Sequence, residues 1–277
     1  MSDRSTDDLA FSVALATRAG EILMDRYERL ERIDYKSARD VVTEADHQSE
    51  ALIIEAIQAI HPGDAILAEE TGEHHARGGS GDAPTSGRGR VWIVDPLDGT
   101  VNYANGIPFF CVSIGLIEHG RPIVAVVHDP TREETFAASS DGPAMLTGAL
   151  GASSRAIHAS TKEQLSDFVI SMALNGRAAT SRARAVRKAI RIPRSMGSAA
   201  LALAYVANGR FDAFVQQGGL STWDIAAAGL IAERGGATVS AMDGGQWFDV
   251  SAPSTSIGLL AAPAAHHRAL LELVRER

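Results

Sequence analysis

A short apolar run that ends in two closely spaced carboxylates constrains this chain more than any other feature. The run from Val91 to Val94 is typical of a buried strand. Asp95 and Asp98 follow it, with Pro96 between them. Proline fixes its own φ and favours an extended backbone at the residue before it. The sequence therefore predicts a rigid turn with two acidic side chains at the end of a strand.

The next two residues add groups that suit an anion. Gly99 lets the backbone approach a ligand without a Cβ in the way, and Thr100 supplies a hydroxyl group. Carboxylate oxygens are the ligands that Mg²⁺ prefers, and the N–H groups of such turns bind anions. The turn therefore predicts a site for a hard cation together with a phosphate.

Three segments resemble the signatures of the inositol monophosphatase family, the Mg²⁺-dependent, lithium-sensitive sugar phosphatases. The stretch from Trp92 to Thr100 resembles the first signature. Ile66 to Glu70 resembles the glutamate segment of the family, and Ser221 to Gly229 resembles the second signature. The segments occur in the family's order and at matching separations, and the similarity extends over residues 9–260.

The resemblance implies which residues hold two or three Mg²⁺ ions. Glu69 and Asp95 would hold the first ion, helped by the Leu97 carbonyl. Asp95, Asp98 and Asp224 would hold the second. Each acid taken alone has a simpler interpretation: Asp224 as a helix cap, Asp98 as part of a turn, and Glu69 as a solvated side chain.

A second pair of residues is expected to handle the attacking water. Thr43 and Asp46 have the spacing of a capping box at a helix start. By resemblance, Asp46 accepts a hydrogen bond from Thr100, and Thr100 together with Glu69 orients and deprotonates the water. The two roles of Asp46 are compatible, because a carboxylate has two oxygens.

The resemblance also implies contacts with the substrate, through Gly99, Thr100, Gly197, Ser198, Ala199, Gln217 and Asp224. The small residues from Gly197 to Ala199 could instead serve helix packing. Gln217 departs from the glutamate that inositol-selective members commonly carry six residues before the signature tryptophan. It loses the charge and adds donors, which leaves selectivity for inositol open. Lys36 matches a family lysine in a loop over the third metal, although a lysine in a charged loop is commonly solvated.

Composition narrows the functional classes. The chain has 277 residues, 45% of them hydrophobic and 22% charged, which is ordinary for a soluble globular protein. A net charge of −8 argues against a nucleic-acid partner. Cys111 is the only cysteine and lies in an apolar run, so we expect a buried thiol and a reducing, cytoplasmic setting. The N-terminus resembles no signal peptide, and no apolar stretch approaches the roughly 20 residues of a membrane span.

Helix and strand patterns alternate along the chain, which predicts an α+β or α/β protein. The resemblance narrows this to a layered αβαβα sandwich of the sugar-phosphatase type. We expect an N-terminal α+β part over residues 1–142, with Glu69 and the first signature, and a C-terminal α/β part over residues 143–277. The first helix is expected over residues 7–29, an irregular segment over 30–42, and a surface loop over 73–90. Further helices are expected from Thr43 to about Ile60 and over residues 197–207, and strands over residues 112–117 and 123–128.

The sequence thus predicts a Mg²⁺-dependent phosphomonoesterase that acts on a small phosphorylated polyol or sugar. Inositol monophosphate is the first candidate for its substrate. Histidinol-phosphatase, fructose-1,6-bisphosphatase and bisphosphate nucleotidase activities of the same superfamily are the alternatives. A regulatory protein that keeps the fold but acts through a partner is the alternative from another class. Family members are frequently dimers, so a homodimer is expected.

Overall fold

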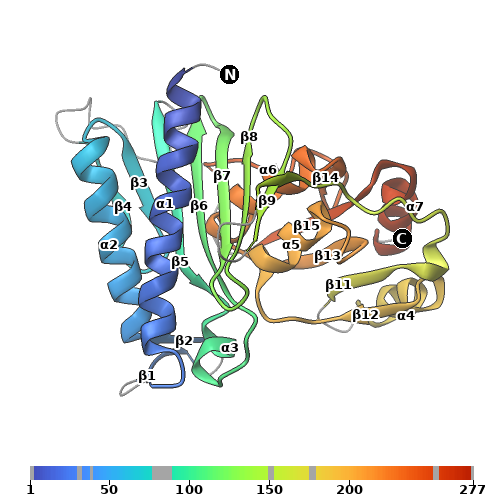
Figure 1. Cartoon of the computed structure of the whole chain (residues 1–277). Coiled ribbons are helices and arrows are strands. Elements are labelled where there is room, and N and C mark those ends of the chain that lie inside the picture. Colours follow the sequence, from blue (N-terminus) through green and yellow to red (C-terminus); the bar gives the residue numbers. More distant parts are fainter. Residues whose placement is uncertain are drawn as a thin grey trace.

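The chain forms five layers, in the order helices, sheet, helices, sheet, helices (Figure 1). The computed structural model describes residues 3–29, 33–37, 40–76, 89–148, 153–174, 179–251 and 256–275. The layering confirms the predicted αβαβα sandwich. Within the described residues, no helix is long and apolar enough to cross a membrane.

The first sheet has eight strands, in the order β10-β9-β8-β7-β6-β5-β3-β4. They are β3 (Ala65–Ala68), β4 (Gly72–His74), β5 (Arg90–Asp98), β6 (Cys111–Glu118), β7 (Arg121–Asp129), β8 (Glu134–Ser139), β9 (Met145–Thr147) and β10 (Arg155–Ala156). β3 and β5 are parallel, and the other neighbours are antiparallel. The parallel pair brings the ends of β3 and β5 to the same edge, which places Glu69 beside Asp95.

Two helices, α1 (Asp3–Arg26) and α2 (Glu44–Ile60), cover the outer face of this sheet. Their apolar residues recur at helical spacing and join one core with the sheet, for example Leu15 and Ile53 with Trp92. A hairpin of β1 (Ile33–Ser37) and β2 (Asp40–Thr43) leads into α2, and the short α3 (Thr100–Ala104) follows β5.

The second sheet has five strands, in the order β12-β11-β13-β15-β14. They are β11 (Val169–Ala173), β12 (Ile192–Arg194), β13 (Ala213–Leu220), β14 (Ala237–Ala241) and β15 (Ile257–Pro263). β11 is parallel to β12 and β13, whereas β15 runs antiparallel to β13 and β14. A 3₁₀ turn, η3 (Leu165–Asp167), precedes β11.

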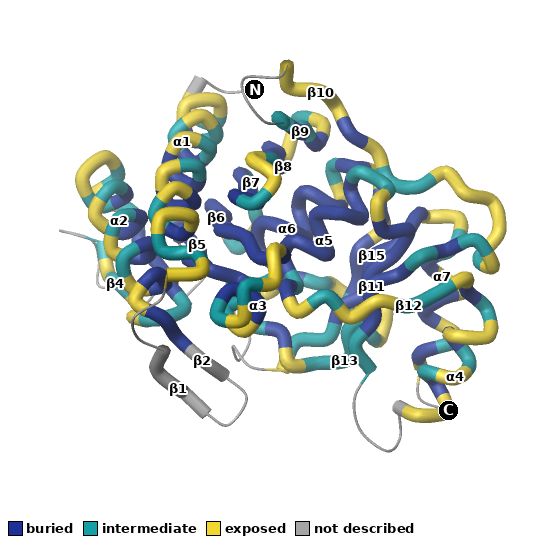
Figure 2. The backbone as a smooth tube through the Cα atoms, turned by 60° about the horizontal axis from the view of Figure 1, so that its bottom comes forward, coloured by how far each residue is buried: buried dark blue, intermediate teal, exposed yellow. Residues whose placement is uncertain are grey.

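Four helices complete the layers. α5 (Ala199–Ala207) and α6 (Thr222–Arg234) lie between the sheets, and Figure 2 shows both as almost continuously buried. α4 (Ala179–Ala189) and α7 (Ala264–Val274) form the layer beyond the second sheet. β13 therefore has a different core on each side: Phe214 packs with α5 and α6, whereas Val215 packs with α4 and α7.

The structure corrects three local predictions. The first helix covers residues 3–26 rather than 7–29. Residues 30–42 were expected to be irregular, but Ile33–Ser37 and Asp40–Thr43 pair as a two-stranded ribbon. Gly72–His74, at the edge of the expected loop, adds a strand to β3. These strands have only three to five residues each, so the hydrophobic pattern gives little signal for them. Most of the expected 73–90 loop, residues 77–88, lies outside the described residues.

Two further expectations concern the Cys111 thiol and the division of the chain at residue 142. Cys111 is fully buried, and burial raises the pKa of its thiol well above the ordinary value, as expected for a structural cysteine. The division at residue 142 stays a prediction. The first sheet itself continues past that point, because β9 and β10 belong to it.

Candidate active site

Three aspartates converge at the edge where β5 ends. One carboxylate oxygen from each of Asp95, Asp98 and Asp224 lies within 4.8 Å of the other two. Asp95 and Asp98 are buried, with 1% and 8% of their surface exposed, and Asp224 is half-buried. Burial raises the pKa of all three carboxyl groups, and the neighbouring acids raise those of Asp95 and Asp224 further. Like charges at this distance require a cation or bound protons.

The start of α5 holds Asp98 in place. Asp98 Oδ2 accepts hydrogen bonds from Ser198 Oγ at 2.5 Å and from Ala200 N at 2.6 Å, and Oδ1 accepts from Ala199 N at 3.3 Å. These donors oppose the effect of burial on the Asp98 pKa. A helix N-terminus presents unpaired N–H groups and favours a negative charge. Ser198 and Ala199 therefore orient a predicted metal ligand.

Asp224 caps the start of α6 and can also serve as the metal ligand that the family resemblance implies. It stands in the first turn of α6 and accepts a hydrogen bond from the Ser221 backbone N–H at 2.6 Å. A carboxylate has two oxygens, so one can serve the cap while the other joins the acidic cluster. Capping and metal ligation are thus compatible at this residue.

Glu69 reaches the cluster from the end of β3. Its backbone N–H donates to Val94 O at 3.1 Å, and its side chain shares a hydrogen bond with Asp95 that raises the Asp95 pKa. Glu50, a buried residue of α2, accepts from Glu70 N at 2.8 Å and from Thr71 N at 3.0 Å. Glu50 therefore fixes the turn that presents Glu69.

Asp46 links the start of α2 to the turn from Asp95 to Thr100, which we call the motif turn. Its Oδ2 accepts from Thr43 N at 2.8 Å and Thr43 Oγ at 2.6 Å, which completes the predicted capping box. Its Oδ1 accepts from Thr100 Oγ at 3.2 Å. Thr100 Oγ also lies 3.0 Å from Leu97 O, and its single proton serves one acceptor at a time. Burial raises the pKa of Asp46 to about 6, against the lowering effect of the Thr43 hydrogen bonds.

Three polar residues on one face of α2 hold the motif turn and the turn after β3 that carries Glu69. Asp46, Ser49 and Glu50 are all buried and occupy positions i, i+3 and i+4. Ser49 Oγ donates to Pro96 O at 3.0 Å. Sequence reasoning missed Ser49 and Glu50. The sequence offered one signal: Asp46, Ser49 and Glu50 are polar residues on the face of α2 that otherwise carries apolar residues. Buried polar groups need hydrogen-bond partners, so such residues point to a contact elsewhere in the chain.

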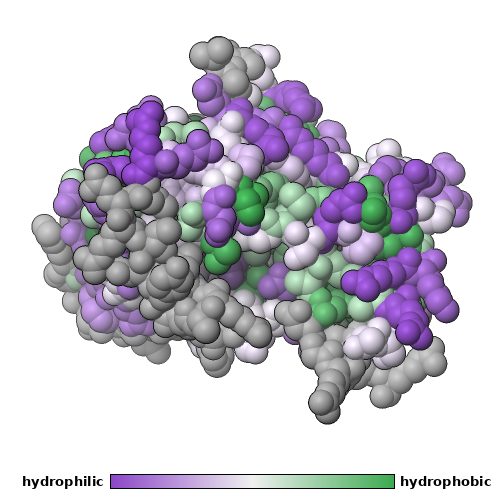
Figure 3. Space-filling model, turned by 90° about the horizontal axis from the view of Figure 1, so that it is seen from below, coloured by the Kyte–Doolittle hydropathy of each residue, from purple (hydrophilic) through white to green (hydrophobic). Residues whose placement is uncertain are grey.

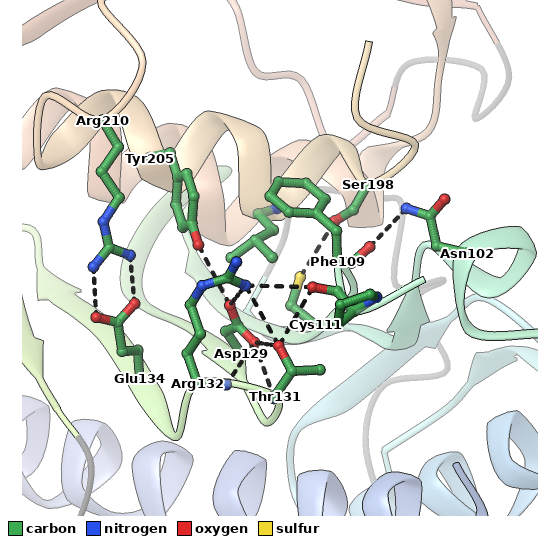
Figure 4. Close-up of polar contacts among 12 residues, drawn as sticks. Asn102, Phe109, Cys111, Asp129, Thr131, Arg132, Glu134, Ser198, Tyr205 and Arg210 are labelled. Carbon is green, nitrogen blue, oxygen red and sulfur yellow. Dashed lines mark hydrogen bonds and ion pairs between the residues drawn. The ribbon is translucent and has the colours of Figure 1, made fainter. Parts of the chain in front are cut away.

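A further missed residue, Asn102, ties α3 to the start of α5. Its Nδ2 donates to Phe109 O and to Met196 O, each at 2.7 Å (Figure 4 draws the first of these bonds). Gly197 lies against it with φ of +81°, and a Cβ there would come within 2.7 Å of Asn102 Oδ1. Gly99 is similarly constrained: its φ is +100°, and a Cβ there would lie 3.2 Å from the Ser198 Cβ. Both glycines permit a close approach of the motif turn to α5.

A pocket of about 300 Å³ opens beside the cluster. Its walls include Asp98 and Asp224 together with Gly197, Ser198 and Ala199, the predicted substrate-contacting segment. Gln216 lines the pocket, whereas Gln217 is absent from the described residues that line it. Figure 3 views the molecule from the end where α3 and β12 lie, and hydrophobic side chains gather in the middle of that face. Lys36 lies in β1, and its side chain is outside the described part of the structure.

The donor set fits a hard divalent cation. Its side-chain ligands would all be carboxylate oxygens, which Mg²⁺ and similar ions prefer over the nitrogen and sulfur ligands typical of zinc sites. The acids are preorganised by a helix N-terminus, a cap and a buried glutamate, so little rearrangement is needed for binding. The three aspartates therefore form an acidic cluster that is compatible with binding a divalent cation, at the edge of a pocket that Asp98 and Asp224 also line.

Comparison with known proteins gives the family. The family model described as "Inositol monophosphatase family" matches residues 5–277. Nus factor SuhB of Pseudomonas aeruginosa is 35% identical, covering 87% of each chain, and inositol monophosphatase 2 of Solanum lycopersicum is 34% identical, covering 87% of this chain and 89% of the relative. The crystal structure of extragenic suppressor protein suhB from Bartonella henselae has a TM-score of 0.85 at 29% identity, covering 98% of this chain and 99% of that one. The chain therefore belongs to the inositol monophosphatase family.

Proposed function

We propose that this chain is a Mg²⁺-dependent phosphomonoesterase that hydrolyses a small polyol or sugar phosphate, with inositol monophosphate as the first candidate. The observation that carries the proposal is the cluster of Asp95, Asp98 and Asp224 oxygens within 4.8 Å, next to a pocket that Asp98 and Asp224 line. Glu69, these three aspartates and the Leu97 carbonyl would hold two or three Mg²⁺ ions. When bound, Mg²⁺ supplies Lewis-acid stabilisation of the phosphoryl charge and lowers the pKa of water.

The chain's own residues orient the reacting groups. Asp46 accepts a hydrogen bond from the Thr100 hydroxyl, and Thr100 with Glu69 would orient the attacking water. The water proton passes to a carboxylate, either directly to Glu69 or through the Thr100 hydroxyl to Asp46. Gly99 and Thr100 offer backbone N–H groups to the phosphoryl oxygens at the start of α3. The segment from Gly197 to Ala199 contacts the alcohol that leaves. Water attacks phosphorus in line with that alcohol, and no phosphoenzyme is expected. A role for Lys36 near the third ion stays a prediction.

A regulatory role is the second candidate, because several curated relatives are named Nus factor SuhB. Identities of 35% to that protein and 34% to inositol monophosphatase 2 do not separate the two functions. The complete acid set favours catalysis, since clustered buried carboxylates cost stability and a purely regulatory surface has no need of them. The expected homodimer and cytoplasmic location stay predictions.

A substrate panel tests the proposal. Phosphate release is measured from equal concentrations of inositol monophosphate, histidinol phosphate, fructose 1,6-bisphosphate and a 3′,5′-bisphosphorylated nucleotide, with Mg²⁺ and with excess chelator. We expect Mg²⁺-dependent release, fastest with inositol monophosphate. Faster release from one of the other three would identify that activity instead. Absence of release from every ester, in protein that binds Mg²⁺, would favour the regulatory candidate.

A further inference from the structure

A second hollow lies between the edge strand β14 of the second sheet and α7, at the end of the molecule away from α1 and α2 (Figure 1). It has a volume of about 490 Å³, and none of its described lining residues lines the pocket beside the acidic cluster. We propose that this hollow, which we call the β14–α7 pocket, is a second anion site that binds the phosphate group of a small compound. The proposal goes beyond the hydrolytic function and does not depend on it.

One face of α7 supplies the charged side chains of the β14–α7 pocket. Arg268, Glu272 and Arg275 all line it at positions i, i+4 and i+7, so they follow one side of the helix to its end. Two guanidinium groups thus face the pocket against one carboxylate. This local excess of positive charge is opposite in sign to the net charge of −8 of the whole chain, and it favours an anionic ligand.

Arg275 is oriented by the turn that follows β14. Its Nη2 donates to the backbone carbonyl of Asp243, which is its one side-chain hydrogen bond among the described residues. A carbonyl leaves the charge of the guanidinium in place, and arginine has five N–H donors, so further donors are available to a ligand. Gly244 makes room for this position, because its φ is +87° and a Cβ there would lie 2.9 Å from Arg275 Nη2. The guanidinium is therefore preorganised for the paired N–H contacts that phosphate accepts.

The carboxylate of the pocket opposes an anion only weakly. Arg268 Nε donates to Glu272 Oε1 at 3.1 Å, but 90% and 61% of these two side chains are exposed. Exposed pairs four residues apart on a helix contribute little to stability, so a ligand can replace Glu272 as the partner of Arg268. Arg268 and Arg275 are about 10 Å apart along the helix axis, and both side chains are long enough to reach one anion between them.

The floor of the pocket is polar and buried. Ser240 and His267 line it with 4% and 9% of their surface exposed, and Ser240 Oγ lies 3.0 Å from His267 Nε2. Burial lowers the pKa of His267, against the effect of the Leu260 carbonyl. An anion beside the imidazole stabilises its protonated form, so this floor accommodates a negative charge rather than repelling it.

The size and lining of the β14–α7 pocket indicate a small phosphate compound. Its volume lies within the range of small-molecule sites, and Val239 and Leu271 add apolar wall. With Glu272 as the one carboxylate among its described lining residues, it lacks the oxygen ligands that a divalent cation requires. The phosphate can be free or part of an ester, since both present the same oxygens to the arginines.

Calorimetric titration of metal-free protein with inorganic phosphate tests the site without turnover. The chelator is dialysed away and the ionic strength is held constant, because a chelator is itself a polyanion that competes for the arginines. Without metal, the carboxylates of the acidic cluster repel phosphate, so binding reports on the second site. Arg275→Gln removes a guanidinium, Glu272→Gln removes the opposing carboxylate, and Arg187→Gln at an exposed position of α4 is the control of equal charge change. Thermal melts confirm folding.

We expect one phosphate per chain. Arg275→Gln should weaken binding by at least about tenfold, because hydrogen bonds between charged groups are the strong ones. Glu272→Gln should strengthen binding by about threefold, and Arg187→Gln should change it by less than about twofold. A second titration with inositol monophosphate separates the two sources of the ligand: tighter binding than that of inorganic phosphate identifies an ester, and weaker binding identifies free phosphate.

Absence of phosphate binding to the wild-type protein, or equal affinity in Arg275→Gln and the wild type, would overturn the site. If Arg275→Gln does not fold, an unchanged affinity in Glu272→Gln has the same meaning. None of these results bears on hydrolysis. Protein that binds phosphate in this pocket but releases none from any ester with Mg²⁺ would instead overturn only the proposed function.

Discussion

The two sides of the site are built with very different densities of polar contacts. On the side of the first sheet, the motif turn is held by Asp46, Ser49 and the start of α5, and the neighbouring glutamate turn is held by Glu50. On the side of the second sheet, the Gln216 side chain makes a single hydrogen bond among the described residues, to Gly218 O of its own strand at 3.3 Å. Several independent hydrogen bonds thus hold the residues of the acidic cluster in place, whereas the pocket wall depends on isolated side chains.

This difference separates chemistry from selectivity. A metal site needs its ligands within a few tenths of an ångström, which requires many supporting contacts. Discrimination between leaving groups needs only one or two correctly placed polar groups. Substitutions on the first side should therefore abolish turnover of every ester, whereas those on the second side should change the ranking of esters.

The largest effect is expected at Asp95. Asp95→Asn removes a carboxylate that two ions are proposed to share, so the rate of phosphate release should fall by at least about 10²-fold for every ester. The metal-free variant should melt at or above the wild-type temperature, because like-charge repulsion is relieved. Asp249→Asn, at an exposed position outside the cluster, serves as the control. A near-wild-type rate would show that the metal site lies elsewhere.

Thr100 should give the next largest effect. Thr100→Val keeps the shape and removes the hydroxyl group that Asp46 holds, so we expect kcat to fall by about 10²-fold with little change in KM. Steady-state kinetics on two esters with different leaving groups provide the measurement. A loss confined to one ester would place Thr100 among the groups that select the substrate.

Glu50 tests the supporting contacts. Glu50→Gln leaves one acceptor for the two N–H groups that Glu50 now holds, so the turn carrying Glu69 should loosen and kcat should fall by about tenfold. Glu55→Gln on the exposed face of the same helix should leave kcat unchanged. Glu50→Asp keeps the charge but should also be less active than the wild type, since the shorter side chain falls short of both groups. Wild-type kcat in Glu50→Gln would show that the turn holds its position without this carboxylate.

The smallest effect is a pH dependence of stability in the metal-free protein. The pKa of Asp46 rises from 3.8 to about 6 on folding, and the pKa values of Asp95, Asp98 and Asp224 are raised as well. At pH values between the unfolded and folded pKa values of these groups, the folded state therefore binds more protons than the unfolded state. The free energy of unfolding consequently falls as pH rises through this range. Asp46 alone accounts for at most about 3 kcal/mol.

Thermal melts of metal-free protein between pH 5 and pH 7.5 measure this dependence. The melting temperature should be higher at pH 5, and Asp46→Asn should have a flatter profile. A melting temperature that rises with pH would mean that these carboxylates are paired with cations rather than with one another.

The acidic cluster was more predictable from sequence than the pocket wall for a physical reason. Asp95, Asp98 and Gly99 act within one rigid turn, so their spacing along the chain fixes their spacing in space. Gln216 and Gln217 are adjacent, and only the pairing of β13 decides which of them faces the pocket. Ser49, Glu50 and Asn102 hold backbone groups far away in sequence, so no local pattern indicates their partners.

The layered fold was predictable because long strands and helices carry strong hydrophobic periodicity. β6 and β7 lie close to the expected ranges, as does α2, whose capping box marks its start. The strands β1, β4 and β12 have only five, three and three residues, too few to give a clear hydrophobic period. The start of α5 was expected at Gly197, but the positive φ of that glycine delays the helix to Ala199.

Dependence of phosphate release on Mg²⁺ tests the central claim most directly. The account predicts that excess chelator abolishes release from inositol monophosphate, that Mg²⁺ restores it, and that Ca²⁺ inhibits it because its larger, looser coordination misplaces the reacting groups. Full activity in excess chelator would contradict the assignment of Asp95, Asp98 and Asp224 as the ligands of a catalytic metal.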